Sequence, residues 1–190
     1  MKIKNENKRQ QILAETAAII THEGAAAVST TKVAKRVGIG QSSLYTYFAS
    51  KQALLMAVFN REQQKLEKLI VEAGVIDTEL PVKTRLIHYV QVLTEFAVAN
   101  PDSLGIIEQI KFLPDFDGDG LNDPKNPVVQ LFQTAIDTGV LPKIDASLYI
   151  ASIFAVARRN GNNIFQKRYR REDVTGSQIL RLVFGDKFND

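Results

Sequence analysis

The sequence contains no cysteine or tryptophan and only two histidines, His22 and His88, among its 190 residues. The lack of cysteine excludes disulfides, thiol catalysis and cysteine-ligated zinc. No run approaches the roughly 18 apolar residues that a membrane span needs. The segment after the basic amino terminus is interrupted by Glu15, His22 and Glu23, so it lacks the apolar core of a signal peptide. These absences predict a cytoplasmic protein with no membrane partner.

What the chain does have is an ordinary globular composition, with 45% hydrophobic and 24% charged residues. Its charge is distributed unevenly. Residues 1–51 carry eight Lys or Arg against three Glu, a net charge of +5, which leaves −2 of the total +3 for the rest. This asymmetry favours polyanion binding at one end, with an accidental surface bias as the alternative. Four of these cations, Lys2, Lys4, Lys8 and Arg9, form either an arm that follows phosphates or a solvated terminus.

Apolar residues recur at helical spacing along the whole chain, and no run alternates with period two. The fold class is therefore predicted as all-α, with about nine helices. Helix ends are signalled by capping residues, prolines and glycines. The first helix is expected to end near Gly24, the second to run from Thr30 or Thr31 to Val37, and the third from 41 to 48. Five further helices are expected to start at Ser50, Pro81, Asn100-Pro101, Asn126-Pro127 and Asp145. The last helix is expected over 174–184 and stops at Gly185.

The stretch from Thr30 to Lys51 is predicted to form two short helices around Gly38-Ile39-Gly40. Leu44 and Phe48, four residues apart, face inward on the second helix. Its outer side then carries amide, hydroxyl and phenol groups: Gln41, Ser42, Ser43, Thr46 and Tyr47. Amides and hydroxyls at the start of such a helix can reach base edges, and Tyr or Lys at its far end can reach phosphates. The pattern predicts DNA binding, with a helical hairpin that has a polar outer face as the alternative.

From about Lys8 to Phe59 the chain resembles the tetracycline-repressor (TetR) family of bacterial transcription factors. The resemblance rests on the Gly24 stop, on Thr-Thr-x-x-Val-Ala-x-x-Val-Gly-Ile, on Ser-Leu-Tyr-x-Tyr-Phe and on Ser50-Lys51. It implies base or nearby backbone contacts by Thr31, Gln41, Ser42 and Ser43, phosphate or groove-wall contacts by Tyr45, Tyr47 and Lys51, and Thr30 within the same DNA-binding set. Two positions depart from the family's common residues, Ser43 for Thr and Thr46 for an aromatic residue.

The resemblance implies an N-terminal three-helix helix-turn-helix domain over residues 1–50 and an antiparallel helical ligand-binding and dimerisation domain over 51–190. It also implies a homodimer that binds a palindromic operator, acts as a repressor and is released by a small-molecule effector. Two alternatives stay open. One is a dimeric DNA-binding protein without an effector. The other is an enzyme on a helical body, for which the sequence offers no nucleophile–base arrangement.

Candidate residues in the predicted body are less specific. Apolar stripes on the last two helices give a candidate dimer interface, with an intramolecular core as the alternative: Ile150, Ile164, Phe165, Ile179, Leu182 and Val183. The candidate ligand pocket comprises Phe96, Ile110, Phe154 and Arg158, with ordinary core packing as the alternative. A buried Arg158 would pair with an acidic ligand or with a protein carboxylate.

An acidic segment resembles a calcium-binding loop. Asp115, Asp117, Asp119 and Asp123 occupy loop positions 1, 3, 5 and 9, and alternating oxygen ligands suit a hard cation. Position 12 is Asn126, which cannot supply a bidentate carboxylate and is better suited to cap the next helix. The segment is therefore a candidate calcium site, with a polar loop as the alternative.

Overall fold

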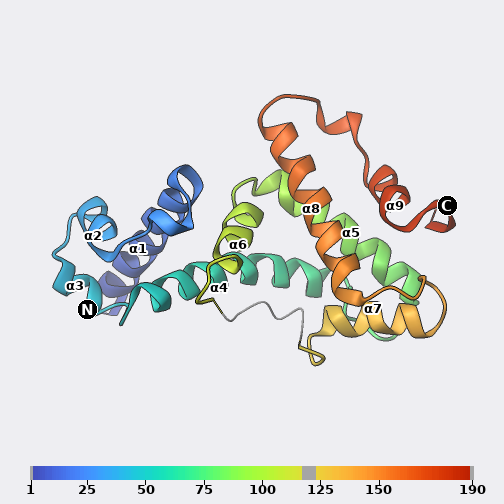
Figure 1. Cartoon of the computed structure of the whole chain (residues 1–190), viewed down its shortest axis with the longest axis horizontal. Coiled ribbons are helices and arrows are strands. Elements are labelled where there is room, and N and C mark those ends of the chain that lie inside the picture. Colours follow the sequence, from blue (N-terminus) through green and yellow to red (C-terminus); the bar gives the residue numbers. More distant parts are fainter. Residues whose placement is uncertain (1, 117–122, 189–190) are drawn as a thin grey trace. The chain divides into compact units, whose positions relative to one another are not determined.

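The computed structural model describes residues 2–116 and 123–188, and every regular element in these stretches is helical. The α-helices are α1 (Lys2–Glu23), α2 (Thr30–Val37), α3 (Gln41–Tyr45), α4 (Lys51–Glu72), α5 (Val82–Ala99), α6 (Ser103–Lys111), α7 (Pro127–Asp137), α8 (Ala146–Phe165) and α9 (Gly176–Phe184) (Figure 1). This confirms the all-α prediction. No helix in the described stretches is long and apolar enough to cross a membrane.

The chain forms two compact units, which we call unit 1 (Met1–Gln64 with Gly105–Gly118) and unit 2 (Lys65–Leu104 with Asp119–Asp190). Helix α4 contributes its first part to unit 1 and its remainder to unit 2. These units describe packing, whereas the division at residue 50 describes function and stays a prediction.

Unit 1 is built on α1, against which α2 packs, with α3 packing on α2 in turn (Figure 1). Helix α1 ends where predicted, because Gly24 adopts φ 92°, a backbone conformation that glycine tolerates best. A short 3-10 helix, η1 (Ala25–Ala27), follows it. The backbone N–H of Ala25 donates a hydrogen bond to Oε1 of Gln109 on α6 at 3.1 Å. A side chain from a distant part of the sequence thus fixes the start of η1.

Two details of unit 1 differ from the sequence expectation. Ser29, rather than Thr30 or Thr31, caps α2, because its hydroxyl accepts the Lys32 backbone N–H at 3.2 Å. Helix α3 ends at Tyr45 rather than at 48, and Thr46 Oγ1 bonds the Ser43 carbonyl at 2.7 Å. The amino-terminal cations belong to α1, which begins at Lys2, and a phosphate-contacting role for them stays a prediction.

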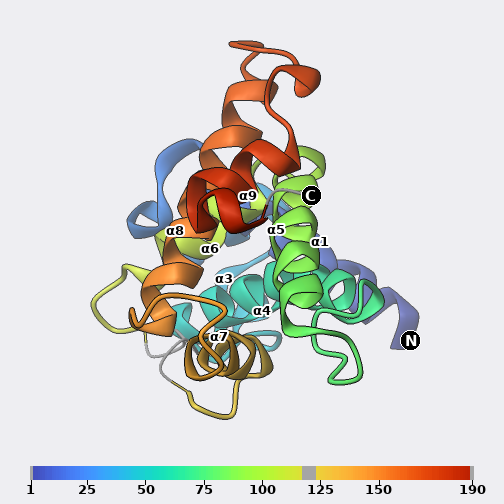
Figure 2. The same ribbon diagram turned by 90° about the vertical axis from the view of Figure 1, so that its right-hand side faces the viewer.

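Unit 2 is centred on the paired helices α5 and α8, and both α7 and α9 pack against this pair (Figure 2). The pair approaches closely at Gly161, where an added Cβ would lie 2.3 Å from the Ala97 carbonyl oxygen. Elsewhere aromatic rings fill the core. The fully buried Phe132 ring lies 5.4 Å from that of Tyr89, 6.1 Å from that of Tyr149 and 6.4 Å from that of Phe184, between centroids. Burial raises the pKa of Tyr89.

The capping predictions in unit 2 succeed at two helices. Asn126 accepts the Val128 N–H at 2.9 Å to start α7, and Asp145 accepts the Ser147 N–H at 2.9 Å to start α8. The prediction for Asn100 is wrong, because Asn100 ends α5 and its side chain donates back to the Phe96 carbonyl at 3.2 Å. Helix α9 begins at Gly176, behind a Thr175 cap, rather than at 174, and it ends at Gly185 as expected.

Candidate nucleic-acid interface

Helices α2 and α3 form a helix-turn-helix whose geometry depends on glycine and on two buried anchors. Gly38 ends α2 in the left-handed conformation, at φ 72° and ψ 38°, which favours glycine because it has no Cβ. Leu44 on α3 is fully buried and Phe48 nearly so. Both Tyr47 and Phe48 donate their backbone N–H to the Leu44 carbonyl, so Phe48 stays inward although α3 has ended.

The polar side of α3 is open to solvent, as the sequence predicts. Of the eight candidate DNA contacts, six are exposed, Tyr47 is half-buried and Thr30 is only 9% exposed; the exposed six are Thr31, Gln41, Ser42, Ser43, Tyr45 and Lys51. Tyr45 exposes 47% of its surface although it is a large aromatic residue. Apolar anchors below and exposed polar groups above make α3 a helix that can enter a major groove.

Thr30 connects two of these exposed side chains. Its Oγ1 accepts a hydrogen bond from Gln41 Nε2 at 3.1 Å and lies 3.3 Å from the Tyr45 hydroxyl. Gln41 and Tyr45 are four residues apart and therefore share one face of α3. Thr30 itself is only 9% exposed, so most of its side chain lies beneath that face, and a direct DNA contact by Thr30 stays a prediction.

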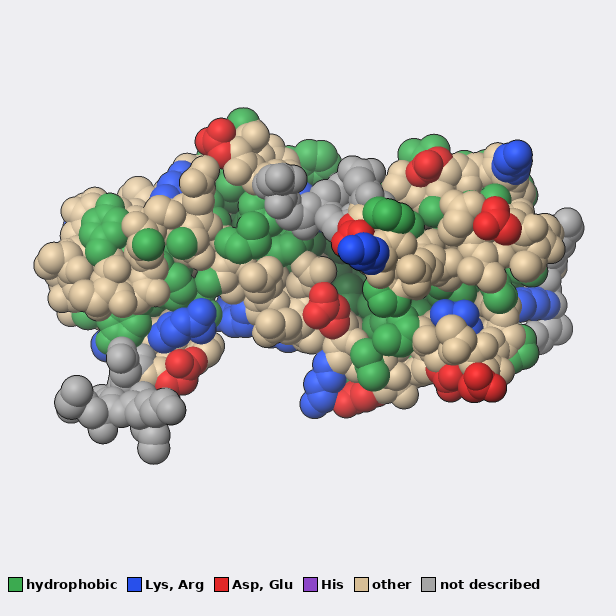
Figure 3. All heavy atoms as spheres, turned by 90° about the horizontal axis from the view of Figure 1, so that it is seen from below, with side chains coloured by type: hydrophobic (Ala, Val, Ile, Leu, Met, Phe, Trp, Pro, Cys, Tyr) green, Lys and Arg blue, Asp and Glu red, His purple; other side chains and the backbone are tan. Residues whose placement is uncertain are grey.

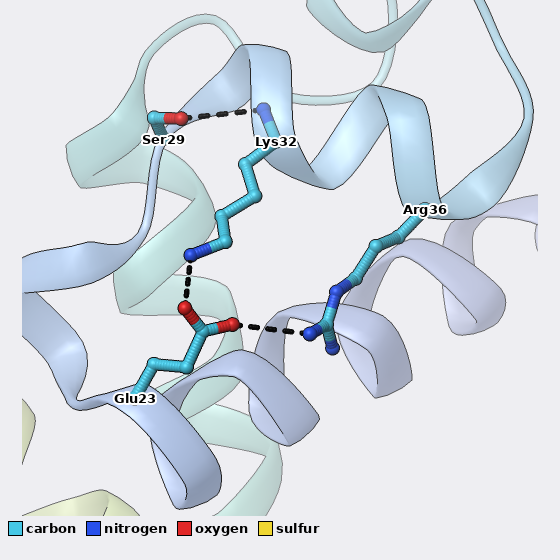
Figure 4. Close-up of polar contacts among 4 residues, drawn as sticks. All are labelled: Glu23, Ser29, Lys32 and Arg36. Atoms are coloured by element: carbon cyan, nitrogen blue, oxygen red, sulfur yellow. Dashed lines mark hydrogen bonds and ion pairs between the residues drawn. The ribbon is translucent and has the colours of Figure 1, made fainter.

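A second polar cluster joins the end of α1 to α2. The Glu23 carboxylate bonds Lys32 Nζ through one oxygen and Arg36 Nη2, at 3.0 Å, through the other (Figure 4). The Lys32 hydrogen bond, assisted by the positive charges of Lys32 and Arg36, holds the pKa of Glu23 below its usual value. This cluster could not be predicted from the sequence, because Glu23 is 9 and 13 residues away from its partners.

The cluster changes how the basic amino-terminal region should be interpreted. Two of its cations share one carboxylate, while the Arg9 guanidinium lies over the Phe48 ring, 5.3 Å from the centroid. Lys51 Nζ donates to the Ala26 carbonyl at 3.4 Å. Lys35 on α2 is exposed and makes no side-chain hydrogen bond or ion pair within the described stretches. Basic side chains on the face drawn in Figure 3 lie in separate groups, several of them beside acidic ones.

The predicted pocket residues divide between the units. Phe96 is buried in unit 2, where Phe154 and Arg158 are half-buried on α8, whereas Ile110 is buried in unit 1. The Arg158 Nε atom is itself enclosed. A ligand role for these side chains stays a prediction.

The predicted dimer residues divide between core and surface of unit 2. Ile150 and Ile179 are buried within the chain, Ile164 and Val183 are half-buried, and Phe165 and Leu182 expose 65% and 70% of their surface. The structure also exposes an outward face of α8, formed by Leu148, Ala151 and Ala155, that the sequence pattern did not indicate. Interface roles remain predictions for all of these residues.

The calcium prediction concerns residues that lie partly outside the described stretches, namely Asp117 and Asp119. Asp115 and Asp123 are exposed, and Asp123 Oδ1 accepts the Lys125 N–H at 2.9 Å. Within residues 2–116 and 123–188 no group of three or more acidic or His side chains is arranged to hold a metal. Calorimetric titration with calcium tests the whole segment.

The helix-turn-helix with its exposed α3 defines the class of the protein, a DNA-binding transcription regulator. Residues 12–58 match the family model of the bacterial regulatory proteins of the tetR family. A crystal structure assigned as a transcription regulator, from Lactobacillus plantarum, is 40% identical, with 93% of this chain and 96% of that chain covered and a TM-score of 0.81. The chain belongs to the TetR family.

More distant relatives support the same fold. A TetR family regulator from Marinobacter aquaeolei VT8 is 17% identical, with coverage of 99% of this chain and 97% of that chain and a TM-score of 0.76. The nucleoid occlusion factor SlmA of Vibrio cholerae is 28% identical over 134 residues, which are 70% of this chain. That match spans 66% of the SlmA chain, just under two thirds of its length.

Proposed function

We propose that the protein is a cytoplasmic repressor that binds a palindromic operator as a homodimer and leaves it when the body binds a small molecule. The observation that carries this proposal is the exposed polar face of α3 over the buried anchors Leu44 and Phe48. Gln41, Ser42 and Ser43 would read base edges from this face. Tyr45, Tyr47 and Lys51 would contact phosphates or groove walls, and the exposed Thr31 would contact the backbone nearby.

These roles are separable by measurement on a duplex that the wild-type protein selects from random sequences. Gln41→Ala should cost about 1–3 kcal/mol and relax discrimination at one base pair per half-site. Lys51→Ala should weaken binding to all sequences and lower the salt slope by about 1. Fluorescence anisotropy at several salt concentrations gives both quantities. Equal affinity of both variants and wild type would refute the interface.

We expect two chains to pair because one helix-turn-helix contacts too short a DNA sequence for specific binding. A single unit contacts few base pairs, and two-fold pairing places two recognition helices one DNA turn apart. Unit 2 offers an apolar surface for pairing on α8 and α9, which includes Leu148, Phe165 and Leu182. Leu182→Glu should produce monomers in sedimentation equilibrium. Phe112→Glu, at an 81%-exposed position in unit 1, is the matched control and should leave the dimer intact.

A small-molecule effector is supported by the fold of the body. The transcriptional regulator FadR of Bacillus subtilis, crystallised with stearoyl-CoA, shares this fold at a TM-score of 0.66 and 17% identity. We propose that Phe96, Phe154 and Arg158, which all belong to unit 2, line the effector site. Effector binding would be coupled to operator affinity through a shift in dimer geometry.

Operator release tests the effector. Stearoyl-CoA is the first probe, and the small-molecule fraction of a cell extract is the second. Release by either supports regulation by a small molecule. Release by neither, from a complex that forms normally, would support a dimeric DNA-binding protein whose body only pairs two chains.

The similarity to nucleoid occlusion factors supports a second candidate function. In that case the protein would act in nucleoid occlusion instead of at one promoter. Cells without the protein would then form division septa over their nucleoids, which microscopy with a DNA stain detects. A normal septum position together with changed transcription of a neighbouring gene would favour the repressor.

A further inference from the structure

We propose that Thr30 is a positioning residue that joins Gln41 and Tyr45 into one hydrogen-bonded unit, so that base reading and phosphate contact depend on each other. The inference rests on the proposed function of α3. Its geometric basis is that one buried hydroxyl, on the first residue of α2, lies within hydrogen-bond distance of side chains at both ends of α3.

The chemistry of a hydroxyl gives this arrangement a direction. A threonine hydroxyl offers one proton and two lone pairs. Gln41 Nε2 donates to Thr30 Oγ1, and either hydroxyl can donate in the 3.3 Å contact between Thr30 and Tyr45; we assign the donor role to Thr30. Tyr45 then keeps its own proton for an outside acceptor. A phosphate oxygen is such an acceptor, and each bond in a chain of this kind polarises the next.

The same bonds leave Gln41 equipped to read a base. Its Oε1 and its second N–H make no other hydrogen bond among the residues that the structure describes, and this is the pair of groups that a glutamine presents to the N6 and N7 edge of adenine. The hydrogen bond to Thr30 restricts the rotamers of the Gln41 side chain in the free protein, and this lowers the conformational entropy that Gln41 loses when DNA binds. The 9% exposure of Thr30 fits a supporting role behind α3 and explains why its hydroxyl matters without touching DNA.

A double-mutant cycle tests the coupling directly. Gln41→Ala, Tyr45→Phe and the double variant are compared with wild type by anisotropy on the selected duplex at fixed salt. The double variant should lose less affinity than the product of the two single losses predicts, by about three- to tenfold. Additive losses, with each single variant impaired, would overturn this inference and leave the proposed function intact. Single variants that bind like wild type would refute both.

Substitutions at Thr30 then separate the hydroxyl from the shape of the side chain. Thr30→Val keeps the shape and removes the hydroxyl, so it should weaken operator binding about five- to tenfold and abolish the coupling between Gln41 and Tyr45. Thr30→Ser keeps the hydroxyl and should restore both affinity and coupling. Binding to random-sequence DNA should fall less than operator binding, because it lacks the base contacts of Gln41 and most phosphate contacts do not involve Tyr45.

Two results at Thr30 would overturn the inference. One is Thr30→Val with coupling like that of wild type. The other is equal loss of affinity in Thr30→Ser and Thr30→Val, which would assign the effect to the methyl group. Circular dichroism and urea unfolding confirm that each variant folds. If Thr30→Val unfolds, the cycle in the wild-type background still decides, because it needs no substitution at Thr30.

Discussion

Units 1 and 2 differ in how their helices are joined. In unit 1, polar side chains connect separate helices: the exposed Glu23 bonds α2, and the buried Thr30 bonds α3. In unit 2 the central contacts are apolar, with an aromatic cluster around Phe132 and a close backbone approach at Gly161. A polar network fixes the direction of side chains that remain exposed, whereas an apolar core fixes where helices lie. Unit 1 is thus suited to present groups to a partner, and unit 2 to hold a scaffold.

The largest expected effect comes from emptying the aromatic cluster of unit 2. Phe132→Ala removes a fully buried ring and should lower the free energy of unfolding by about 3–5 kcal/mol. Phe112→Ala is the matched control, because Phe112 is 81% exposed and should change stability by less than about 0.5 kcal/mol. Urea denaturation followed by circular dichroism measures both. Similar losses at the two positions would contradict a core centred on Phe132.

The close approach of α5 and α8 predicts a smaller but specific effect. A methyl group at Gly161 would meet the Ala97 carbonyl at 2.3 Å, so Gly161→Ala should force the helices apart and cost about 1–3 kcal/mol. Gly105 on α6 has open space around a new Cβ. Gly105→Ala should therefore stabilise the protein by about 0.5–1 kcal/mol, because glycine is unfavourable inside helices. The opposite signs are measured by the same denaturation, and destabilisation by both would contradict this account.

The sequence was informative where a local signal decides the structure. Gly24 and Gly38 mark turns that only unusual backbone angles can make, and the spacing of Leu44 and Phe48 orients α3. The predictions of helix caps failed where a neighbouring residue or a neighbouring helix competes for the capping side chain. Ser29 precedes two threonines and takes the position, while Asn100 closes one helix instead of opening the next.

Contacts between residues far apart in the chain were not predictable. Glu23 meets Lys32 and Arg36 only because the turn after α1 brings α2 back. The burial of Thr30 could not be predicted either, because residue type indicates chemistry but not burial. In unit 2, Ile150 and Phe165 are both apolar residues of α8 at helical spacing, although Ile150 is buried and Phe165 is exposed. Which apolar side of α8 faces inward depends on α5 and α7, which no local pattern describes.

The salt dependence of DNA binding can distinguish two lysines of α2 in unit 1, Lys35 and Lys32. Lys35 is exposed without an ion pair in the described stretches, whereas Lys32 already bonds Glu23. Lys35→Ala should lower the slope of log affinity against log salt by about 0.9 if it neutralises one phosphate. Lys32→Ala should lower the slope less, because part of its charge is compensated by Glu23. Equal changes in the two variants would show that the Glu23 contact does not persist on DNA.

The smallest expected effect is the pH dependence of the Glu23 cluster. The Lys32 hydrogen bond lowers the pKa of Glu23 below its ordinary 4.5 in the folded protein. A carboxylate with a lowered folded-state pKa stabilises the fold above its unfolded pKa, and this contribution disappears as the pH falls through the folded value. Glu23→Gln should therefore be less stable than wild type at neutral pH, and the difference should vanish well below pH 4.5.

Thermal unfolding of both proteins across that range measures the difference. Glu67→Gln, at an exposed position of α4 without an ion pair among the residues that the structure describes, corrects for the general loss of one negative charge. Because Glu23 is solvent-exposed, the shift in melting temperature should be small, as it is for surface ion pairs in general. A gap between Glu23→Gln and wild type that stays constant with pH would mean that the side chain acts through packing, and that unit 1 does not depend on this charge cluster to join α1 to α2.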